Sequence, residues 1–199
     1  MGKFQIFVFL VIVMSATTVV AEGDAEAGKI LGYTCTGCHG IPGYNNTYPT
    51  YKVPKIGGQN ETYLVSALKA YRSGERKHAT MQAQAQSMTD QDIENIAAWL
   101  ARFEKEPAGE TSAAPEAISA QVQVCASCHG NDGLAADPSY PALAGQYASY
   151  LEHALKSYRN GTRKNAIMGG FAANLTDQDI AGIAEWYSKM KAVRDLAGY

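Results

Sequence analysis

The chain contains one stretch of sequence twice, and each copy carries a Cys-x-x-Cys-His motif. Together, Cys35-Thr36-Gly37-Cys38-His39 and Cys125-Ala126-Ser127-Cys128-His129 account for all 4 cysteines of the 199 residues. Three further segments repeat at a constant offset of 87 residues: 54–59 with 141–146, 68–74 with 155–161, and 89–93 with 176–180. A repeat of this length, with its own motif, indicates two copies of one small domain and not a solenoid.

The motif itself indicates covalent attachment of a c-type haem. In such sites the two thiols form thioethers with the porphyrin, and the adjacent His ligates the iron. Two covalently bound haem c groups are therefore expected, on Cys35, Cys38 and His39 in the first copy and on Cys125, Cys128 and His129 in the second. A four-cysteine zinc site would not explain the His after each pair, and a thioredoxin-like redox pair would need a βαβ context. A disulfide within either pair would constrain little of the chain.

The first 21 residues have the layout of a secretory signal peptide. Lys3 precedes an apolar run over 4–14, and small and polar residues follow up to Ala21, after which we expect cleavage. An uncleaved membrane anchor is the competing interpretation, because the apolar stretch through Val20 is only slightly shorter than a membrane span.

The net charge of the chain gives no indication of a nucleic-acid partner. It carries 17 Lys and Arg against 19 Asp and Glu, a net charge of −2, and loss of residues 1–21 removes only Lys3, which gives 16 − 19 = −3. We expect no nucleic-acid partner. A loose association with a membrane remains compatible with the sequence.

The repeat predicts a first domain at 22–103, a linker at 104–115 that is polar and rich in Pro and small residues, and a second domain at 116–199. Each domain is near the lower size limit for a stable apolar core, so a covalently held haem would complete it.

The pattern within each domain is helical, and we expect an all-α fold class. Helices are predicted over 24–34 and 115–124 before the motifs, and from residue 59 or 60 through Tyr71. Thr89 resembles an N-cap with acids in the first turn. After it, apolar residues recur at i, i+3, i+4 and i+7, and no sustained strand alternation competes.

The ligand on the other face of each iron decides between electron transfer and ligand chemistry. In the second copy Met168 is the only methionine in the loop expected before the last helix, whereas the first copy offers Met81 and Met88. The repeat places Met81 opposite Met168 and Met88 opposite Leu175. We therefore expect Met81 and Met168 to be axial ligands and Met88 to pack beside the following helix cap.

Two histidines lie outside the motifs. His78 precedes Met81 by three residues. If His78 were the axial ligand instead of Met81, the haem would be bis-His and of lower potential, but the counterpart of His78 in the second copy is Asn165. We expect His78 to be an exposed loop residue and His153, on a helix opposite Ser66, to have no special role.

These motifs, in this order, resemble those of the dihaem cytochrome c4 family over essentially the whole mature chain. Each Cys-x-x-Cys-His is followed by Pro-x-x-x-Gly-Gln, Tyr-Arg-x-Gly, a candidate ligand Met and a Thr-Asp-Gln-Asp-Ile helix. The resemblance implies two tandem class I cytochrome c domains related by a pseudo-twofold axis, with the haem propionate edges near the interface.

The resemblance also implies roles for two prolines. The carbonyls of Pro54 and Pro141 are expected to accept a hydrogen bond from the His of their own motif and so to orient its ring; turn geometry alone is the alternative role. Haem is attached outside the cytoplasm in the cytochromes that the chain resembles, which favours a periplasmic location.

The first copy departs from the pattern in a Tyr-rich segment, 41–53, where it has three extra residues between the motif and the proline. Its tyrosines could form a docking surface for a redox partner or pack over the haem edge.

The expected function is electron shuttling in the periplasm, from an upstream donor such as a quinol-oxidising complex to a terminal oxidase or reductase, with no enzymatic activity. The alternatives are a haem electron-acceptor subunit of a periplasmic dehydrogenase and a dihaem peroxidase, which would need an open axial site. A redox or gas sensor is a weaker alternative, because no signalling domain is attached.

Overall fold

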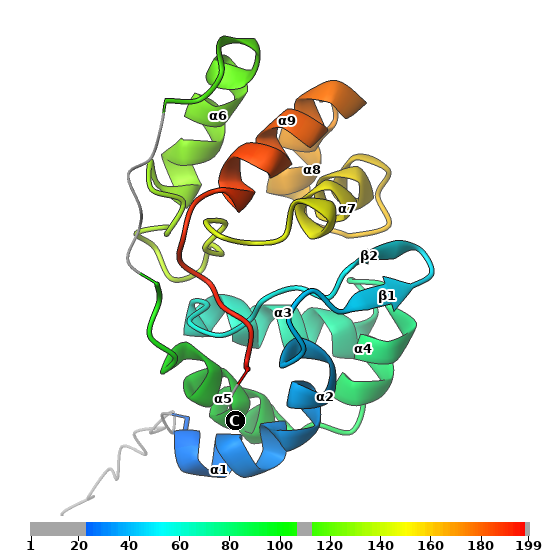
Figure 1. Cartoon of the computed structure of the whole chain (residues 1–199). Coiled ribbons are helices and arrows are strands. Elements are labelled where there is room, and N and C mark those ends of the chain that lie inside the picture. The colour runs from blue at the N-terminus through cyan, green and yellow to red at the C-terminus, as the bar shows by residue number, and fades with distance from the viewer. Residues whose placement is uncertain (1–22, 107–112, 198–199) are drawn as a thin grey trace, which may run out of the picture.

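The computed structural model describes residues 23–106 and 113–197 and consists of two helical domains stacked on each other (Figure 1). The expected signal peptide, 1–21, lies outside the described residues, as does the middle of the expected linker. No helix within the described part of the chain is both long enough and apolar enough to cross a membrane.

The elements follow one another in the same order in both domains, with additions in the first. The first domain contains α1 (Ala25–Leu31), the 3-10 helix η1 (Gly32–Cys35), α2 (Thr36–His39), β1 (Asn45–Thr47), β2 (Thr50–Lys52), α3 (Glu61–Ser73), α4 (Ala79–Ala85) and α5 (Asp90–Ala101). The second contains α6 (Glu116–His129), α7 (Ala148–Arg159), α8 (Ala166–Ala172) and α9 (Asp177–Ser188). The all-α fold class is confirmed, with the antiparallel hairpin β1–β2 as an addition that the sequence pattern did not predict.

The last helix of each domain begins with a capping box. The Thr89 hydroxyl accepts a hydrogen bond from the backbone N–H of Asp92 at 3.1 Å, and the Asp92 carboxylate accepts one from the backbone N–H of Thr89 at 2.9 Å. Thr176 and Asp179 repeat both bonds at the start of α9. Reciprocal bonds of this kind satisfy backbone donors that a helix leaves free at its N-terminus.

The first helix of each domain crosses the last helix of that domain at very close range. A Cβ on Gly28 of α1 would lie 1.9 Å from the Asn95 carbonyl oxygen of α5. In the second domain the glycine is on the other helix, because a Cβ on Gly182 of α9 would lie 2.9 Å from a methyl group of Ile118 in α6. The repeat aligns Gly28 with Ile118 and Asn95 with Gly182, so both domains keep a small residue at the crossing but exchange the helix that supplies it.

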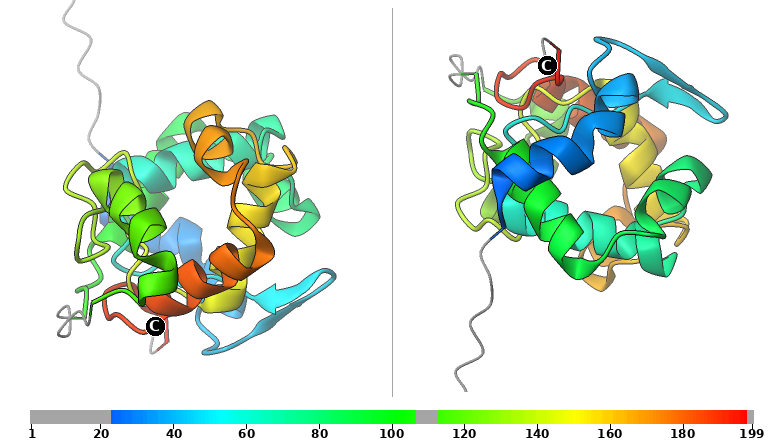
Figure 2. Two further views of the ribbon diagram at one scale, coloured as in Figure 1. Left: turned by 90° about the horizontal axis from the view of Figure 1, so that it is seen from above. Right: turned by 90° about the horizontal axis from the view of Figure 1, so that it is seen from below.

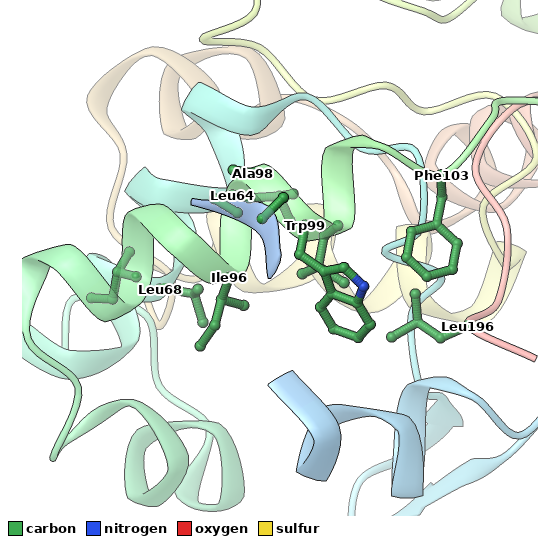
Figure 3. Packing of buried hydrophobic residues seen from close by; sticks show 11 residues of the cluster. Leu64, Leu68, Ile96, Ala98, Trp99, Phe103 and Leu196 are labelled. Atoms are coloured by element: carbon green, nitrogen blue, oxygen red, sulfur yellow. The ribbon is translucent and has the colours of Figure 1, made fainter. Parts of the chain in front are cut away.

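The apolar core of the first domain lies between α3 and α5 and includes a residue from the end of the chain. Trp99 and Phe103 pack edge to face, with ring centroids 5.6 Å apart. Leu196, 1% exposed, belongs to the same cluster (Figure 3). In the second domain a separate cluster joins α6, α7 and α9 around Tyr187.

The tail that brings Leu196 there runs from α9 back along the first domain (Figure 1). Gly57 and Arg194 exchange two backbone hydrogen bonds of 3.0 Å, and the backbone N–H of Leu196 donates to the His39 carbonyl at 2.9 Å. The tail therefore fastens the end of the chain to the segment that holds the first motif. The domain boundaries expected from the repeat stay a prediction.

The two domains face each other across an approximate twofold axis, and Figure 2 shows their helices stacked in views from above and below. Arg76 and Arg163, which are equivalent in the repeat, pair in an isolated antiparallel bridge. A contact between equivalent positions lies on the axis that relates two copies, as expected for pseudo-twofold domains.

The hairpin β1–β2 lies at this interface. Tyr51 is only 7% exposed and stacks on the His153 ring of α7, with centroids 4.0 Å apart. The backbone N–H of Lys52 donates to the Ser149 hydroxyl at 3.0 Å. Tyr48, at the tip, is 93% exposed. The Tyr-rich segment thus packs one tyrosine between the domains and leaves another open to solvent.

Candidate functional site

One cavity of about 610 Å³ extends across both domains and contains the residues of both motifs. The sequence-predicted residues that line it are Cys35, Cys38, His39, Pro54 and Met81 from the first domain and Cys125, Cys128, His129, Pro141 and Met168 from the second. Every candidate site residue therefore lines the same cavity.

The cysteines of each motif are placed by helical turns. Cys35 ends η1 and Cys38 lies in α2, whereas α6 carries both Cys125 and Cys128 in one continuous helix. Residues three apart lie on one face of a helix, so each pair presents two thiols to the cavity side by side. All four are half-buried and none forms a disulfide, and burial raises the pKa of the Cys35 and Cys125 thiols. Among the described residues, no three His, Cys, Asp or Glu side chains gather as a metal-binding group.

The histidine of each motif is buried and held by one hydrogen bond. His39 Nδ1 donates to the Pro54 carbonyl at 2.7 Å, and His129 Nδ1 donates to the Pro141 carbonyl at 3.0 Å. Because a carbonyl can only accept, Nδ1 carries the proton and Nε2 keeps its lone pair. Burial lowers the pKa of both rings, which are therefore neutral at pH 7. Each ring thus offers a metal-binding nitrogen in a fixed orientation.

The candidate methionines lie in short helices, which corrects the expectation of a loop. Met81 is in the first turn of α4 and Met168 is in the first turn of α8. The helices form because the residue three positions earlier caps each of them: His78 Nδ1 accepts the backbone N–H of Met81 at 3.2 Å, and Asn165 Oδ1 accepts that of Met168 at 2.9 Å. These caps fix the backbone of each methionine.

His78 is thus not the exposed loop residue that we expected. It is half-buried, and its Nε2 lies 3.2 Å from the Asn46 side-chain oxygen in β1. Since Nδ1 accepts from a backbone N–H, Nε2 carries the proton and donates to Asn46. Both ring nitrogens of His78 are thus engaged in hydrogen bonds, and the residue serves as the N-cap of α4. Its contact with Asn46 depends on the hairpin, which no local sequence signal indicated.

Met88 packs against the apolar cluster of the first domain. Its carbonyl accepts a hydrogen bond from the Arg72 guanidinium at 2.8 Å, and Arg72 also pairs with Asp90 in the first turn of α5 at 2.5 Å. This is the packing beside the helix cap that the repeat alignment predicted.

Two arginines, Arg76 and Arg163, line the cavity. Arg76 is only 8% exposed, and neither Arg76 nor Arg163 forms an ion pair with a carboxylate in the part of the chain that the structure describes. Their partners are phenols: Arg163 donates to the Tyr63 hydroxyl at 3.0 Å, and Arg76 donates to the Tyr150 hydroxyl. Sequence analysis missed these four residues, although the repeat pairs Arg76 with Arg163 and Tyr63 with Tyr150.

The field at this cluster is strongly positive. Burial alone would raise the pKa of the Tyr63 phenol, but the Arg76 and Arg163 guanidiniums outweigh burial and lower it. A buried charge is costly unless it is paired. The carboxylates of two haem propionate edges would supply the missing negative charge, so the donors at the domain interface fit the cofactor that the motifs imply.

Tyr187 gives a second indication of fit. Its hydroxyl is the one buried side-chain oxygen or nitrogen of the described residues that has no hydrogen-bond partner in the protein, and Tyr187 lines the cavity. A buried polar atom of this kind requires an explanation, and an occupant of the cavity with polar atoms provides one.

Comparison with known proteins decides the family. The cytochrome c family model matches residues 25–103 and 116–191. The chain belongs to the cytochrome c family. Within it, the dihaem cytochrome c4 group fits over nearly the whole length: cytochrome c4 of Stutzerimonas stutzeri is 38% identical, over 92% of this chain and 97% of the relative.

Two further relatives agree with this placement. The crystal structure of reduced recombinant cytochrome c4 from Pseudomonas stutzeri superposes with a TM-score of 0.67 at 31% identity, over 83% of this chain and 98% of the other. A protein of Stutzerimonas stutzeri (strain A1501) named thiosulfate dehydrogenase electron acceptor is 30% identical, over 86% of this chain and 84% of the relative. The family and its dihaem c4 members establish that this cytochrome c holds two covalently bound haem c groups.

Proposed function

We propose that this protein is a periplasmic electron carrier whose two haems are each ligated by one histidine and one methionine. The observation that carries the proposal is the symmetric pair of sites. Both have a neutral His with Nδ1 bonded to a proline carbonyl, and both have a capped helix that presents a Met to the same cavity.

The residues of each site would have separate roles in holding the haem. Cys35 and Cys38, and their equivalents Cys125 and Cys128, would hold the porphyrin through thioethers. His39 and His129 would bind iron through Nε2, and Met81 and Met168 would close the opposite face. When bound, each haem supplies reversible one-electron chemistry at its iron, and Met/His ligation favours the ferrous state.

Closed coordination argues against a peroxidase. Peroxidase chemistry needs a vacant or displaceable position at the iron, and both methionines have backbones fixed by N-caps. The protein's part is then to keep the ligands in place in both oxidation states.

An upstream quinol-oxidising complex or a similar donor would supply electrons, and a terminal oxidase or reductase would receive them. A second candidate role is that of the haem electron acceptor of a periplasmic dehydrogenase. The relative named thiosulfate dehydrogenase electron acceptor favours it specifically. The proposed location follows from the signal-like sequence at 1–21 and from export being needed for attachment of c-type haem in the cytochromes that the chain resembles.

Stopped-flow mixing of the purified holoprotein with candidate partners tests the carrier role. We expect rapid reduction by a quinol-oxidising complex and rapid reoxidation by a terminal oxidase, at rates that compete with turnover. Faster reduction by a thiosulfate-oxidising dehydrogenase would favour the second role. No competent exchange with any of these partners would exclude both roles.

A further inference from the structure

A glutamine of the second domain forms two hydrogen bonds with the backbone beside the first-domain histidine. Gln146 is 4% exposed. Its Oε1 accepts the backbone N–H of Lys55 at 2.9 Å, and its Nε2 donates to the Lys55 carbonyl at 2.8 Å. One side chain thus holds a residue of the opposite domain by both of its backbone polar groups.

The equivalent glutamine of the first domain does the same in the other direction. Gln59 is also 4% exposed. Its Oε1 accepts the backbone N–H of Ala142 at 2.8 Å, and its Nε2 donates to the Ala142 carbonyl at 2.9 Å. Gln59 corresponds to Gln146 in the repeat and Ala142 to Lys55, so the pseudo-twofold axis relates the two pairs.

The chemistry fixes the orientation of both side-chain amides. A backbone N–H can only donate, and a backbone carbonyl can only accept, so the glutamine oxygen must face the first and the nitrogen the second. In each glutamine Oε1 also accepts the N–H of the following residue, Asn60 or Tyr147, at 2.8 Å and 3.1 Å. Exchanging oxygen and nitrogen in either side chain would place its NH₂ group against two backbone N–H donors and its oxygen against a backbone carbonyl.

The bonded N–H groups belong to the two peptide units that orient the histidines. Lys55 N–H and Pro54 C=O are the two ends of one peptide group. The carbonyl accepts from His39 at 2.7 Å while the N–H donates to Gln146. In the second domain the Pro141–Ala142 peptide bonds His129 and Gln59 in the same way. Each histidine is therefore linked through one peptide group to a glutamine of the other domain.

We propose that Gln59 and Gln146 are positioning residues that tune the opposite domain's haem across the domain interface. Donation from a peptide N–H polarises the group and makes its carbonyl a stronger acceptor, and bonds in such chains strengthen one another by about 10–30%. A stronger acceptor at Nδ1 raises the electron density of the imidazole, which stabilises ferric iron relative to ferrous. Gln146 acts in this way on the first-domain haem through His39, and Gln59 acts on the second-domain haem through His129.

The tuning rests on the proposed His/Met haem sites, but its pattern is specific. A glutamine that only held the domains together would affect both haems, or mainly the stability of the protein. A glutamine that acts through the shared peptide affects the haem of the domain to which it does not belong.

Gln146→Leu and Gln59→Leu form a reciprocal pair that tests this pattern. Leu removes the acceptor from Lys55 N–H, so the Pro54 carbonyl becomes a weaker partner for His39. In Gln146→Leu we expect the reduction equilibrium of the first-domain haem to shift about threefold toward ferrous, about 28 mV at about 59 mV per decade. The second-domain haem should stay near its wild-type potential, and Gln59→Leu should give the reverse. The readout is an NMR redox titration of the holoprotein with haem resonances assigned to each domain.

The Nδ1–H proton resonance of each histidine gives a second readout. In Gln146→Leu the Nδ1–H resonance of His39 should move to lower frequency, as expected for a weaker hydrogen bond. The Nδ1–H resonance of His129 should not move. Ser149→Ala is the matched control. It removes another bond in which a backbone N–H, that of Lys52, donates across the interface to a side-chain oxygen at 3.0 Å, but not to the peptide that bonds His39. We expect it to leave both haem potentials unchanged.

Gln146→Met and Gln59→Met replace the Leu variants if those do not fold, since Met keeps the length and offers only a weak acceptor. The tuning role would be overturned if the potential shifted only for the haem in the same domain as the substitution, shifted equally for both haems, or did not shift. It would also be overturned if Ser149→Ala had an equal effect. Haem content and the near-infrared thioether band of the wild type are measured first. If the wild type lacks two His/Met haems, the proposed function fails; if it has them and the reciprocal pattern is absent, only the tuning role fails.

Discussion

Each candidate axial ligand is held by a partner that leaves its metal-binding atom available. The proline carbonyls engage Nδ1 of His39 and His129 and leave Nε2 available. The N-caps engage the backbones of Met81 and Met168 and leave the sulfur atoms available. Backbone carbonyls therefore orient the histidines, and capping side chains set the backbone position of the methionines.

The methionine assignment can be tested one domain at a time. In Met81→His we expect the potential of one haem to fall by about 0.1–0.3 V, within the range of roughly 0.8 V that axial ligands span, because an imidazole stabilises ferric iron relative to a thioether. Spectroelectrochemistry of the holoprotein measures this shift, and Met168→His should lower the other potential instead.

Met88→His is the control for adding a histidine to the same domain. Met88 packs against the apolar cluster, so this change should disturb stability more than either potential. If Met81→His leaves both potentials in place while Met88→His lowers one, the ligand assignment is wrong.

The candidate ligands could be predicted from sequence because the chain repeats them. The offset that aligns Met81 with Met168 separated the ligand candidate from Met88 without any structure. The interface residues were not predicted, because their partners are distant in sequence. The Oε1 atom of Gln146 bonds a residue 91 positions away, and nothing local to a Gly-Gln pair indicates that contact.

At the scale of elements, the strongest local signals gave the helix positions. The Thr-x-x-Asp segments predicted the starts of α5 and α9, and capping boxes occur there. The hairpin had no such signal, since its strands have 3 residues each, too few for an alternation to be recognised. Contacts with α7 stabilise it, through Tyr51 and Lys52.

The capping boxes predict how stability depends on pH. The Thr176 hydroxyl lowers the pKa of Asp179 below its ordinary value of 3.8, and the Thr176 backbone N–H adds to this effect. The folded state thus binds this proton less readily than the unfolded state. The contribution is present above the unfolded pKa and is lost as pH falls through the folded pKa. We expect Asp179→Asn to lower the thermal midpoint at pH 7 by about 1–3 °C, and we expect that deficit to shrink toward zero as the pH falls below about 3.8. Circular dichroism melts at a series of pH values measure both effects.

Glu185→Gln removes a carboxylate from the same helix and serves as the control. Glu185 pairs with Lys189 at 3.0 Å, and both side chains are largely exposed. Such a pair contributes little, so the midpoint at pH 7 should stay near that of the wild type. A deficit in Asp179→Asn that stays constant or grows toward low pH would contradict the assigned role of the cap.

At the scale of the whole molecule, the two domains are joined by direct contacts as well as by a common cavity. The tail after α9 adds Leu196 to the core of the first domain, and Arg76 and Arg163 meet between the domains. The repeat predicted two domains and their order. It could not predict the path of the tail, because residues 189–199 do not repeat the sequence of the corresponding segment, 102–112. The shared cavity likewise arises only when the copies are stacked.

The central claim is that both haems of this cytochrome c have one His and one Met as axial ligands, so that neither iron has an open position. Near-infrared absorption of the fully oxidised holoprotein, normalised to its haem content, tests it most directly. The thioether-to-ferric-haem band should appear at neutral pH with the intensity of two methionine-ligated haems per chain. A band of half that intensity, or none, would show that at least one haem lacks its methionine and would contradict the account.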